Sequence, residues 1–189
     1  MAITNLQRKF DKLLFFHLFI RVGNFSYFTK YTEEMKLEFI DQNTYKELDF
    51  EAIFDDLHND LYRKYGKIIH ANSYIKIAWS SDLLLPQFLD LSSKIYAIGI
   101  DQNFAIYDFE KKHRIMYLDL RFLFCEMVKF NQKLFIATEL EVIVVDLEDY
   151  NIIDTISLPD MYDKIEINCD QIDINCLENI LIKYYTRDD

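Results

Sequence analysis

Carboxylates are the side chains through which this sequence could most readily do chemistry, because Asp and Glu number 32 among 189 residues. Two carboxyl groups can work as general acid and base, but so many carboxylates give no spacing that singles out one pair. One set resembles a calcium-binding loop: Asp170, Asp173, Asn175 and Glu178. Its spacing is wrong, the obligatory glycine is absent, and the isoleucines between its members indicate an alternating strand.

The histidines, cysteines and glycines also complete no pattern typical of a catalytic or ligand site. None of the four histidines has a Cys, Asp or His neighbour at metal-ligand spacing: His17, His58, His70 and His113. Three cysteines stand without a CxxC pair: Cys125, Cys169 and Cys176. The three glycines are isolated, so the chain has no phosphate-binding loop. We therefore predict no catalytic residue, no metal and no cofactor, and a protein that is not an enzyme.

The placement of charge is the informative feature. Between Leu134 and Glu178 the sequence has twelve acidic residues and one base, Lys164, whereas the other 144 residues hold 20 acids and 20 bases. A solvated surface would explain such a stretch, and so would a basic protein partner. Nucleic acid is excluded as its ligand, since phosphates need the opposite sign. The predicted partner-binding residues are Asp146, Glu148, Asp149, Asp160 and Asp163, with the Tyr-rich segment Phe25 to Tyr31 as the alternative surface.

The elements that must position these carboxylates are the strands of an internal repeat. One pattern runs from Lys94 to Leu120 and again from Lys133 to Leu158, and a third copy begins at Gln171. We predict two antiparallel hairpins, with Asp108 and Asp146 in equivalent places, from these strands: Ile95 to Ile100, Phe104 to Phe109, Leu134 to Ala137 and Val142 to Leu147. The offset is 39 residues at Lys94/Lys133 and 38 at Asp108/Asp146, which predicts one residue lost in the first turn.

Helices are expected before these strands. Apolar residues at steps of three or four predict a helix from Thr44 to Tyr65 that ends at Gly66, and Thr32 to Phe39 is a shorter helical candidate. Lys67 to Trp79 is interpreted as a further hairpin. The predicted fold class is α+β in a single domain, residues 1–189, with a mainly helical part (1–66) followed by an antiparallel β part (67–189).

The cysteine usage and the apolar segments indicate the compartment. An odd number of cysteines without metal spacing is typical of reduced thiols in a cytosol. The apolar run Leu13 to Ile20 is too short to span a bilayer and contains His17, so it is interpreted as a buried helix or strand. A cytoplasmic protein without a membrane partner is the expectation.

Two resemblances add to this interpretation. The repeats resemble the inner strands of β-propeller blades, in which strand, tight turn and strand recur at about forty residues. About two and a half units cannot close a ring of four blades, so we expect an open or curled sheet closed by the helical part or by a partner. The acidity and small size are similar to those of bacterial immunity proteins of polymorphic or contact-dependent toxin systems. That resemblance implies binding and occlusion of a basic toxin, for example a nuclease; the alternative is a non-enzymatic β-repeat scaffold or assembly subunit.

Overall fold

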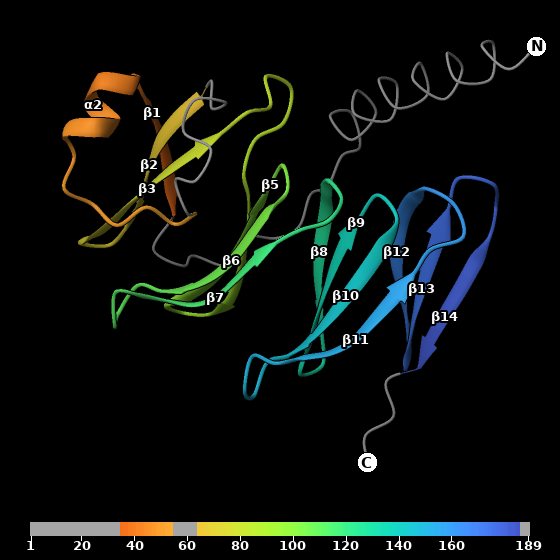
Figure 1. Cartoon of the computed structure of the whole chain (residues 1–189). Coiled ribbons are helices and arrows are strands. Elements are labelled where there is room, and N and C mark those ends of the chain that lie inside the picture. The colour runs from red at the N-terminus through yellow and green to blue at the C-terminus, as the bar shows by residue number, and fades with distance from the viewer. Residues whose placement is uncertain (1–34, 55–63, 186–189) are drawn as a thin grey trace, which may run out of the picture.

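The structure is a computed structural model that describes residues 35–54 and 64–185. These residues form fourteen strands in four antiparallel sheets, which follow one another in chain order and lie in a row (Figure 1). Sheet 1 contains β1 (Lys36–Ile40), β2 (Lys64–His70) and β3 (Ser73–Trp79). Sheet 2 contains β4 (Gln87–Ser92), β5 (Ile95–Ile100), β6 (Asn103–Asp108) and β7 (His113–Asp119). Sheet 3 contains β8 (Phe124–Phe130), β9 (Lys133–Thr138), β10 (Glu141–Asp146) and β11 (Ile152–Ser157). Sheet 4 contains β12 (Tyr162–Asn168), β13 (Gln171–Cys176) and β14 (Leu181–Tyr185).

The sheets pack face to face, because their middle strands are apolar on both sides. On β5, Tyr96 and Ile98 belong to the core shared with sheet 1, whereas Ala97 between them belongs to the core shared with sheet 3. On β9, Leu134 faces sheet 2 and its neighbour Phe135 faces sheet 4. Because successive side chains of a strand point to opposite faces of the sheet, one strand contributes apolar side chains to both neighbouring cores. This explains why the hydrophobic runs of these strands are almost continuous.

The predicted repeat is confirmed, with one correction to its offset. The four predicted strands are β5, β6, β9 and β10, and Asp108 and Asp146 both end their strands. Phe109 N–H donates to Lys94 O, and Leu147 N–H donates to Gln132 O in the same way, 38 residues later. Lys94 is thus equivalent to Gln132 and not to Lys133, so the offset is 38 across the predicted hairpins and no residue is lost in the first turn.

Bulges and turns follow the same period. The ladders between β6 and β7 and between β10 and β11 shift register at Ile106/Tyr107 and Val144/Val145. Residues with left-handed backbone also recur 38 apart, at Lys112 and Tyr150, and at Asn131 and Cys169. Because the chain has only three glycines, non-glycine residues must adopt these conformations, at some conformational cost.

The prediction of a long helix from Thr44 to Tyr65 is wrong. Helix α2 spans only Gln42–Glu47, with Asp41 as its N-cap, and Leu48 already has extended backbone. The segment then bonds to the edge of sheet 1, since Ile53 N–H donates to Lys76 O and Lys76 N–H to Glu51 O. Tyr65 and Gly66 are part of β2, and Leu57 and Leu61 lie outside the described residues.

The α+β fold class is contradicted as well. Within the described part of residues 1–66, strand β1 covers the last residues of the short helix that was expected from Thr32 to Phe39. Helix α2 is the one helix in that part of the chain. The strands outnumber it so strongly that the described chain is an all-β structure. The hairpin expected from Lys67 to Trp79 is confirmed as β2 and β3. Residues 1–34, including the apolar run Leu13 to Ile20, lie outside the described residues.

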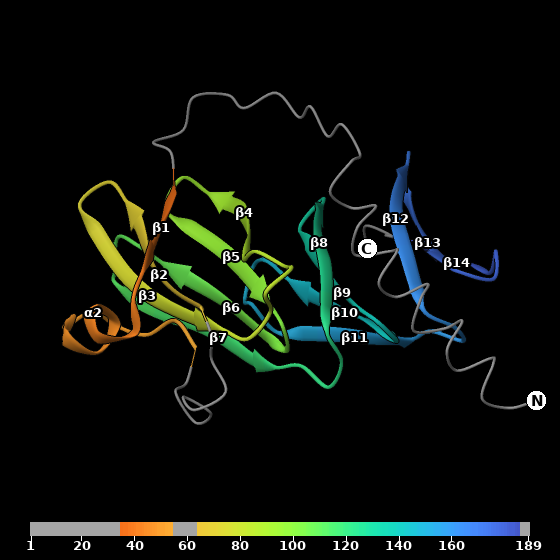
Figure 2. The ribbon, with the colours of Figure 1, turned by 90° about the horizontal axis from the view of Figure 1, so that it is seen from above.

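The first strands of sheets 2, 3 and 4 connect the sheets along one side of the row (Figure 2). Gln87 Nε2 on β4 donates to Cys125 O on β8 at 2.9 Å, and Lys129 Nζ on β8 donates to Leu91 O on β4 at 2.6 Å. On the other side of β8, Glu126 Oε1 accepts the N–H of Ile165 on β12 at 3.1 Å. Polar bonds between these first strands therefore supplement the apolar cores between the sheets. Among the described residues, no helix is long and apolar enough to cross a membrane.

Candidate functional site

The five predicted partner-binding carboxylates do not form one surface. Asp146, Glu148 and Asp149 lie at the turn between β10 and β11, whereas Asp160 and Asp163 lie where β11 leads into β12. These places are the two opposite ends of β11, a strand of six residues. At about 3.4 Å per residue, the two groups are separated by roughly 17 to 20 Å.

Three of these carboxylates stabilise the turns that contain them. Asp146 Oδ1 accepts the N–H of Glu148 at 2.7 Å, and Asp160 Oδ1 accepts that of Met161 at 2.8 Å. Asp149 accepts the backbone and side-chain N–H groups of Asn151, and these hydrogen bonds lower the pKa of Asp149 below its ordinary value. Part of the acidity that suggested a partner surface therefore has a local structural role.

Backbone hydrogen bonds gather three turns of sheets 3 and 4 at one end of the molecule. Tyr162 N–H donates to Glu139 O, and Leu158 N–H donates to Leu140 O, which joins the β11–β12 connection to the β9–β10 turn. Leu177 N–H donates to Met161 O, which brings the β13–β14 turn beside the same connection. We call this place the acidic end, and its carboxylates are Glu139, Glu141, Asp160, Asp163 and Glu178.

Three members of the acidic end were missed from the sequence: Glu139, Glu141 and Glu178. The 38-residue period could have found them, because turns at equivalent positions of consecutive sheets must emerge at the same end. Lys164, the one base between Leu134 and Glu178, bonds to Glu166 at 2.7 Å. Leu140 and Leu181 are exposed beside the carboxylates. The acidic end thus combines negative charge with exposed apolar side chains.

Beneath the acidic end, a buried polar cluster connects β8 to β12. Tyr162 O–H donates to Glu126 Oε1, which also accepts the N–H of Ile165. Burial, with Glu126 beside it, raises the pKa of the Tyr162 phenol. Burial also raises the pKa of the Cys125 thiol to about 12, and the Glu139 and Glu126 carboxylates contribute. Both groups are therefore protonated at neutral pH, which suits hydrogen-bond donation and disfavours nucleophilic chemistry.

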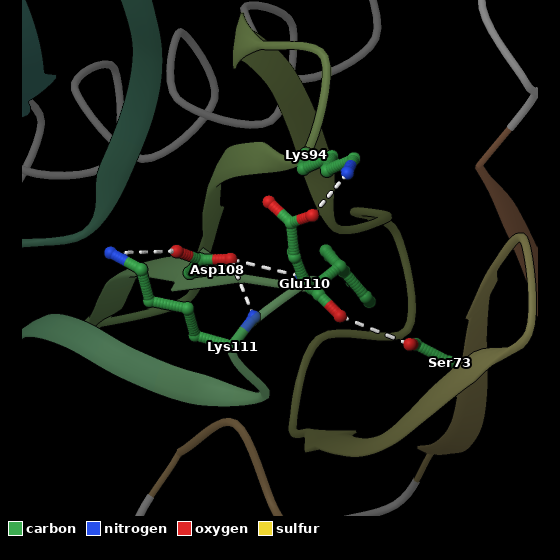
Figure 3. A network of polar contacts seen from close by, with 6 residues as sticks. Ser73, Lys94, Asp108, Glu110 and Lys111 are labelled. Carbon is green, nitrogen blue, oxygen red and sulfur yellow. Dashed lines mark hydrogen bonds and ion pairs between the residues drawn. The ribbon is translucent and has the colours of Figure 1, made fainter.

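At the opposite end, the β6–β7 turn holds sheet 1 against sheet 2 (Figure 3). Asp108 Oδ1 accepts the N–H groups of Glu110 and Lys111, each at 2.9 Å, and Asp108 Oδ2 lies 3.7 Å from Lys111 Nζ. Glu110 forms an ion pair with Lys94, and Ser73 Oγ donates to Phe109 O at 3.0 Å. At this turn two of the acidic side chains form ion pairs, Glu110 with Lys94 and Asp108 with Lys111.

The histidines inside the described ranges have different surroundings. His70 is buried, with Nε2 3.3 Å from the hydroxyl oxygen of Tyr96 and its ring 5.1 Å from that of Phe109. His113 is exposed at the start of β7. His17, His58 and the segment Phe25 to Tyr31 lie outside the described residues. Within residues 35–54 and 64–185, no three or more His, Cys, Asp or Glu side chains are grouped so that they could hold a metal ion.

No family model matches the chain, and none of the curated proteins is similar to it in sequence. Several solved structures resemble parts of it. The computationally designed Ika4 protein is 9% identical, with a TM-score of 0.49 over 64% of this chain and 79% of that one. Hsv2 of Kluyveromyces lactis is 12% identical, with a TM-score of 0.45 over 66% of this chain and 40% of that one. BBS1N, solved in complex with ARL6DN, is 17% identical, with a TM-score of 0.46 over 66% and 41%.

This chain therefore spans about two fifths of the Hsv2 and BBS1N chains that it resembles. At TM-scores below 0.5, these likenesses add nothing to what the sheets themselves show. The four sheets form a row of consecutive antiparallel meanders packed face to face, which is the arrangement of propeller blades.

Proposed function

We propose that this protein is a non-enzymatic interaction module, a propeller-like scaffold that presents its acidic end to a basic protein. The observation that carries the proposal is the convergence of three turns from two sheets, which places five carboxylates and two exposed leucines on one rigid end. Backbone bonds between the turns fix their positions before binding, so little conformational entropy is lost on association.

The physics of such a surface predicts fast association more than high affinity. Carboxylates that are not paired with bases attract a basic partner over roughly a Debye length, about 8 Å at physiological salt. The exposed leucines would then supply apolar area that the partner covers. The narrower hypothesis of an immunity protein stays a prediction, and a partner with toxic activity would establish it.

The test compares equal charge changes at the two ends. One variant carries Glu141→Lys, Asp163→Lys and Glu178→Lys at the acidic end. The control carries Glu148→Lys, Asp149→Lys and Asp170→Lys at the opposite end of the same two sheets. Each protein is immobilised and exposed to lysate of the cells that express it, and retained proteins are quantified by mass spectrometry. Circular dichroism first establishes that both variants fold.

We expect that the wild type and the control variant retain a basic protein from the lysate, and that the acidic-end variant does not retain it. Its association with wild type should slow as salt rises, because the charges are screened. Equal retention by all three proteins, or equal loss in both variants, would contradict a specific role for the acidic end.

A further inference from the structure

Among the residues that the structure describes, sheet 4 has one strand fewer than the two sheets before it. In sheets 2 and 3 the fourth strands, β7 and β11, pair antiparallel with the third strands, β6 and β10. In sheet 4 the third strand is β14, and among the described residues it pairs with β13 alone. An edge with unpaired backbone groups is a template for strand addition.

The turn before β14 determines which of its peptide groups are free. Cys176 N–H donates to Ile180 O across this hairpin, so residues 176 and 180 face each other as a hydrogen-bonded pair. Bonded and non-bonded pairs alternate along an antiparallel ladder. Ile182 and Tyr184 therefore direct their peptide groups toward β13, whereas Leu181, Lys183 and Tyr185 direct theirs outward.

The side chains of β14 determine which residues an added strand should contain. Ile182 and Tyr184 pack against the core shared with sheet 3, where Ile156 of β11 also lies. Lys183 is on the other face, opposite Asp173, and is exposed. A strand residue placed opposite Lys183 would share its face and meet an ammonium group, whereas the residues on either side would turn toward the apolar core.

We propose that β14 binds an antiparallel strand of a partner protein, with an acidic residue opposite Lys183 and apolar residues on either side. This inference rests on the proposed role as an interaction module but uses the edge of β14, which adjoins the acidic end at Leu181. A second copy of this chain fits poorly, because symmetric pairing of two β14 strands centred on Lys183 would place the two ammonium groups opposite each other.

The probe is a synthetic peptide, Ser-Thr-Val-Glu-Val-Thr-Ser, and its control has Lys in place of Glu. Amide exchange of the full chain is followed residue by residue with NMR. The Glu peptide should protect the amides of Leu181, Lys183 and Tyr185, which should exchange fast in the free protein. It should bind about fivefold more tightly than the Lys peptide, since an opposite-charge cross-strand pair contributes up to about 1 kcal/mol.

Two substitutions separate backbone pairing from charge. Lys183→Pro removes an outward N–H, which an edge strand tolerates, and should abolish binding of the Glu peptide. Lys183→Thr keeps that N–H and removes the charge, so binding should remain while the preference for Glu disappears. Because wild-type exchange is measured as well, the outcome does not depend on folding of the proline variant.

Three results would overturn the proposal. The outward amides could remain unprotected at saturating peptide concentration. They could be protected already in the free chain, which would mean that another part of it occupies the edge. They could become protected with rising protein concentration and dimer formation, which would make a second copy the occupant. The double variant Glu141→Lys with Asp163→Lys, which leaves the β13–β14 hairpin unaltered, should keep the peptide-induced protection of Leu181, Lys183 and Tyr185, so failure here and failure of the proposed function are distinguishable.

Discussion

Asp101 combines a costly charge with a demanding backbone conformation. It begins the turn between β5 and β6 with a φ of 51°, and its Oδ2 accepts the N–H of Ser80 at 2.6 Å. Burial raises the pKa of this carboxyl above its ordinary value, although the hydrogen bonds from Ser80 and Ser81 oppose that shift. The native state therefore holds the proton of Asp101 more tightly than the unfolded state, and stability falls as pH rises through the raised pKa.

We predict that Asp101→Asn stabilises the protein at neutral pH. The amide oxygen can still accept from Ser80, asparagine tolerates left-handed backbone, and no charge is buried. Urea unfolding at pH 7 should give a higher free energy of unfolding for the variant. The advantage should shrink as the pH falls through the raised pKa and be lost below about pH 4, where Asp101 of the wild type is protonated in both states. An advantage that persists unchanged at low pH would point to backbone conformation and not to charge.

At the scale of elements, the turns after β6 and β10 depend on one aspartate each. Asp108 accepts two backbone N–H groups, whereas Asp146 accepts one. We predict that Asp146→Ala lowers the free energy of unfolding by about 1 kcal/mol, which is typical of one net hydrogen bond, and that Asp108→Ala costs more. Asn at either position should restore most of the loss, because it keeps an acceptor. Thermal unfolding of the four variants is the measurement, and equal effects of Ala and Asn would contradict this account.

The same turns show what the sequence could predict and what it could not. Strands such as β5 and β9 were predictable because residues buried on both faces make short, continuous apolar runs bounded by polar turns. Residues after Glu47 were misassigned because helical spacing of apolar residues does not exclude other ways to bury them. Phe50 stacks on Tyr74 with ring centroids 5.4 Å apart, and Ile53 packs into the core between sheets 1 and 2 from an extended segment. Tertiary packing, which a single sequence does not display, decided that conformation.

The candidate site was only partly predictable for a related reason. The charge counted along the chain pointed to residues 134–178, which contain the acidic end, but strands reverse direction at every turn. Neighbouring acids such as Asp149 and Asp160 consequently emerge at opposite ends, while Glu139 and Asp160, 21 residues apart, come together. Assigning each turn to an end requires the number and order of the strands between them.

At the scale of the whole molecule, stability depends on contacts between consecutive sheets. Phe135 is fully buried between sheets 3 and 4, with its ring 5.3 Å from that of Tyr184. We predict that Phe135→Ala costs about 3 to 5 kcal/mol. In amide exchange, β12–β14 should lose protection while β5 and β6 keep most of theirs, because stacked units contact only their neighbours. Ile153→Ala, at an exposed position, is the control and should cost less than about 0.5 kcal/mol. Uniform loss of protection would mean that the four sheets unfold as one unit.

The order of the sheets also has a consequence during synthesis on the ribosome. The core between sheets 1 and 2 is complete at Tyr117, the next at Tyr150, and the last at Tyr184. Each new sheet therefore emerges beside a neighbour that is already made, and no core must wait for a distant part of the polypeptide. A nascent chain of this kind would expose only its most recent apolar face, which limits the time available for aggregation.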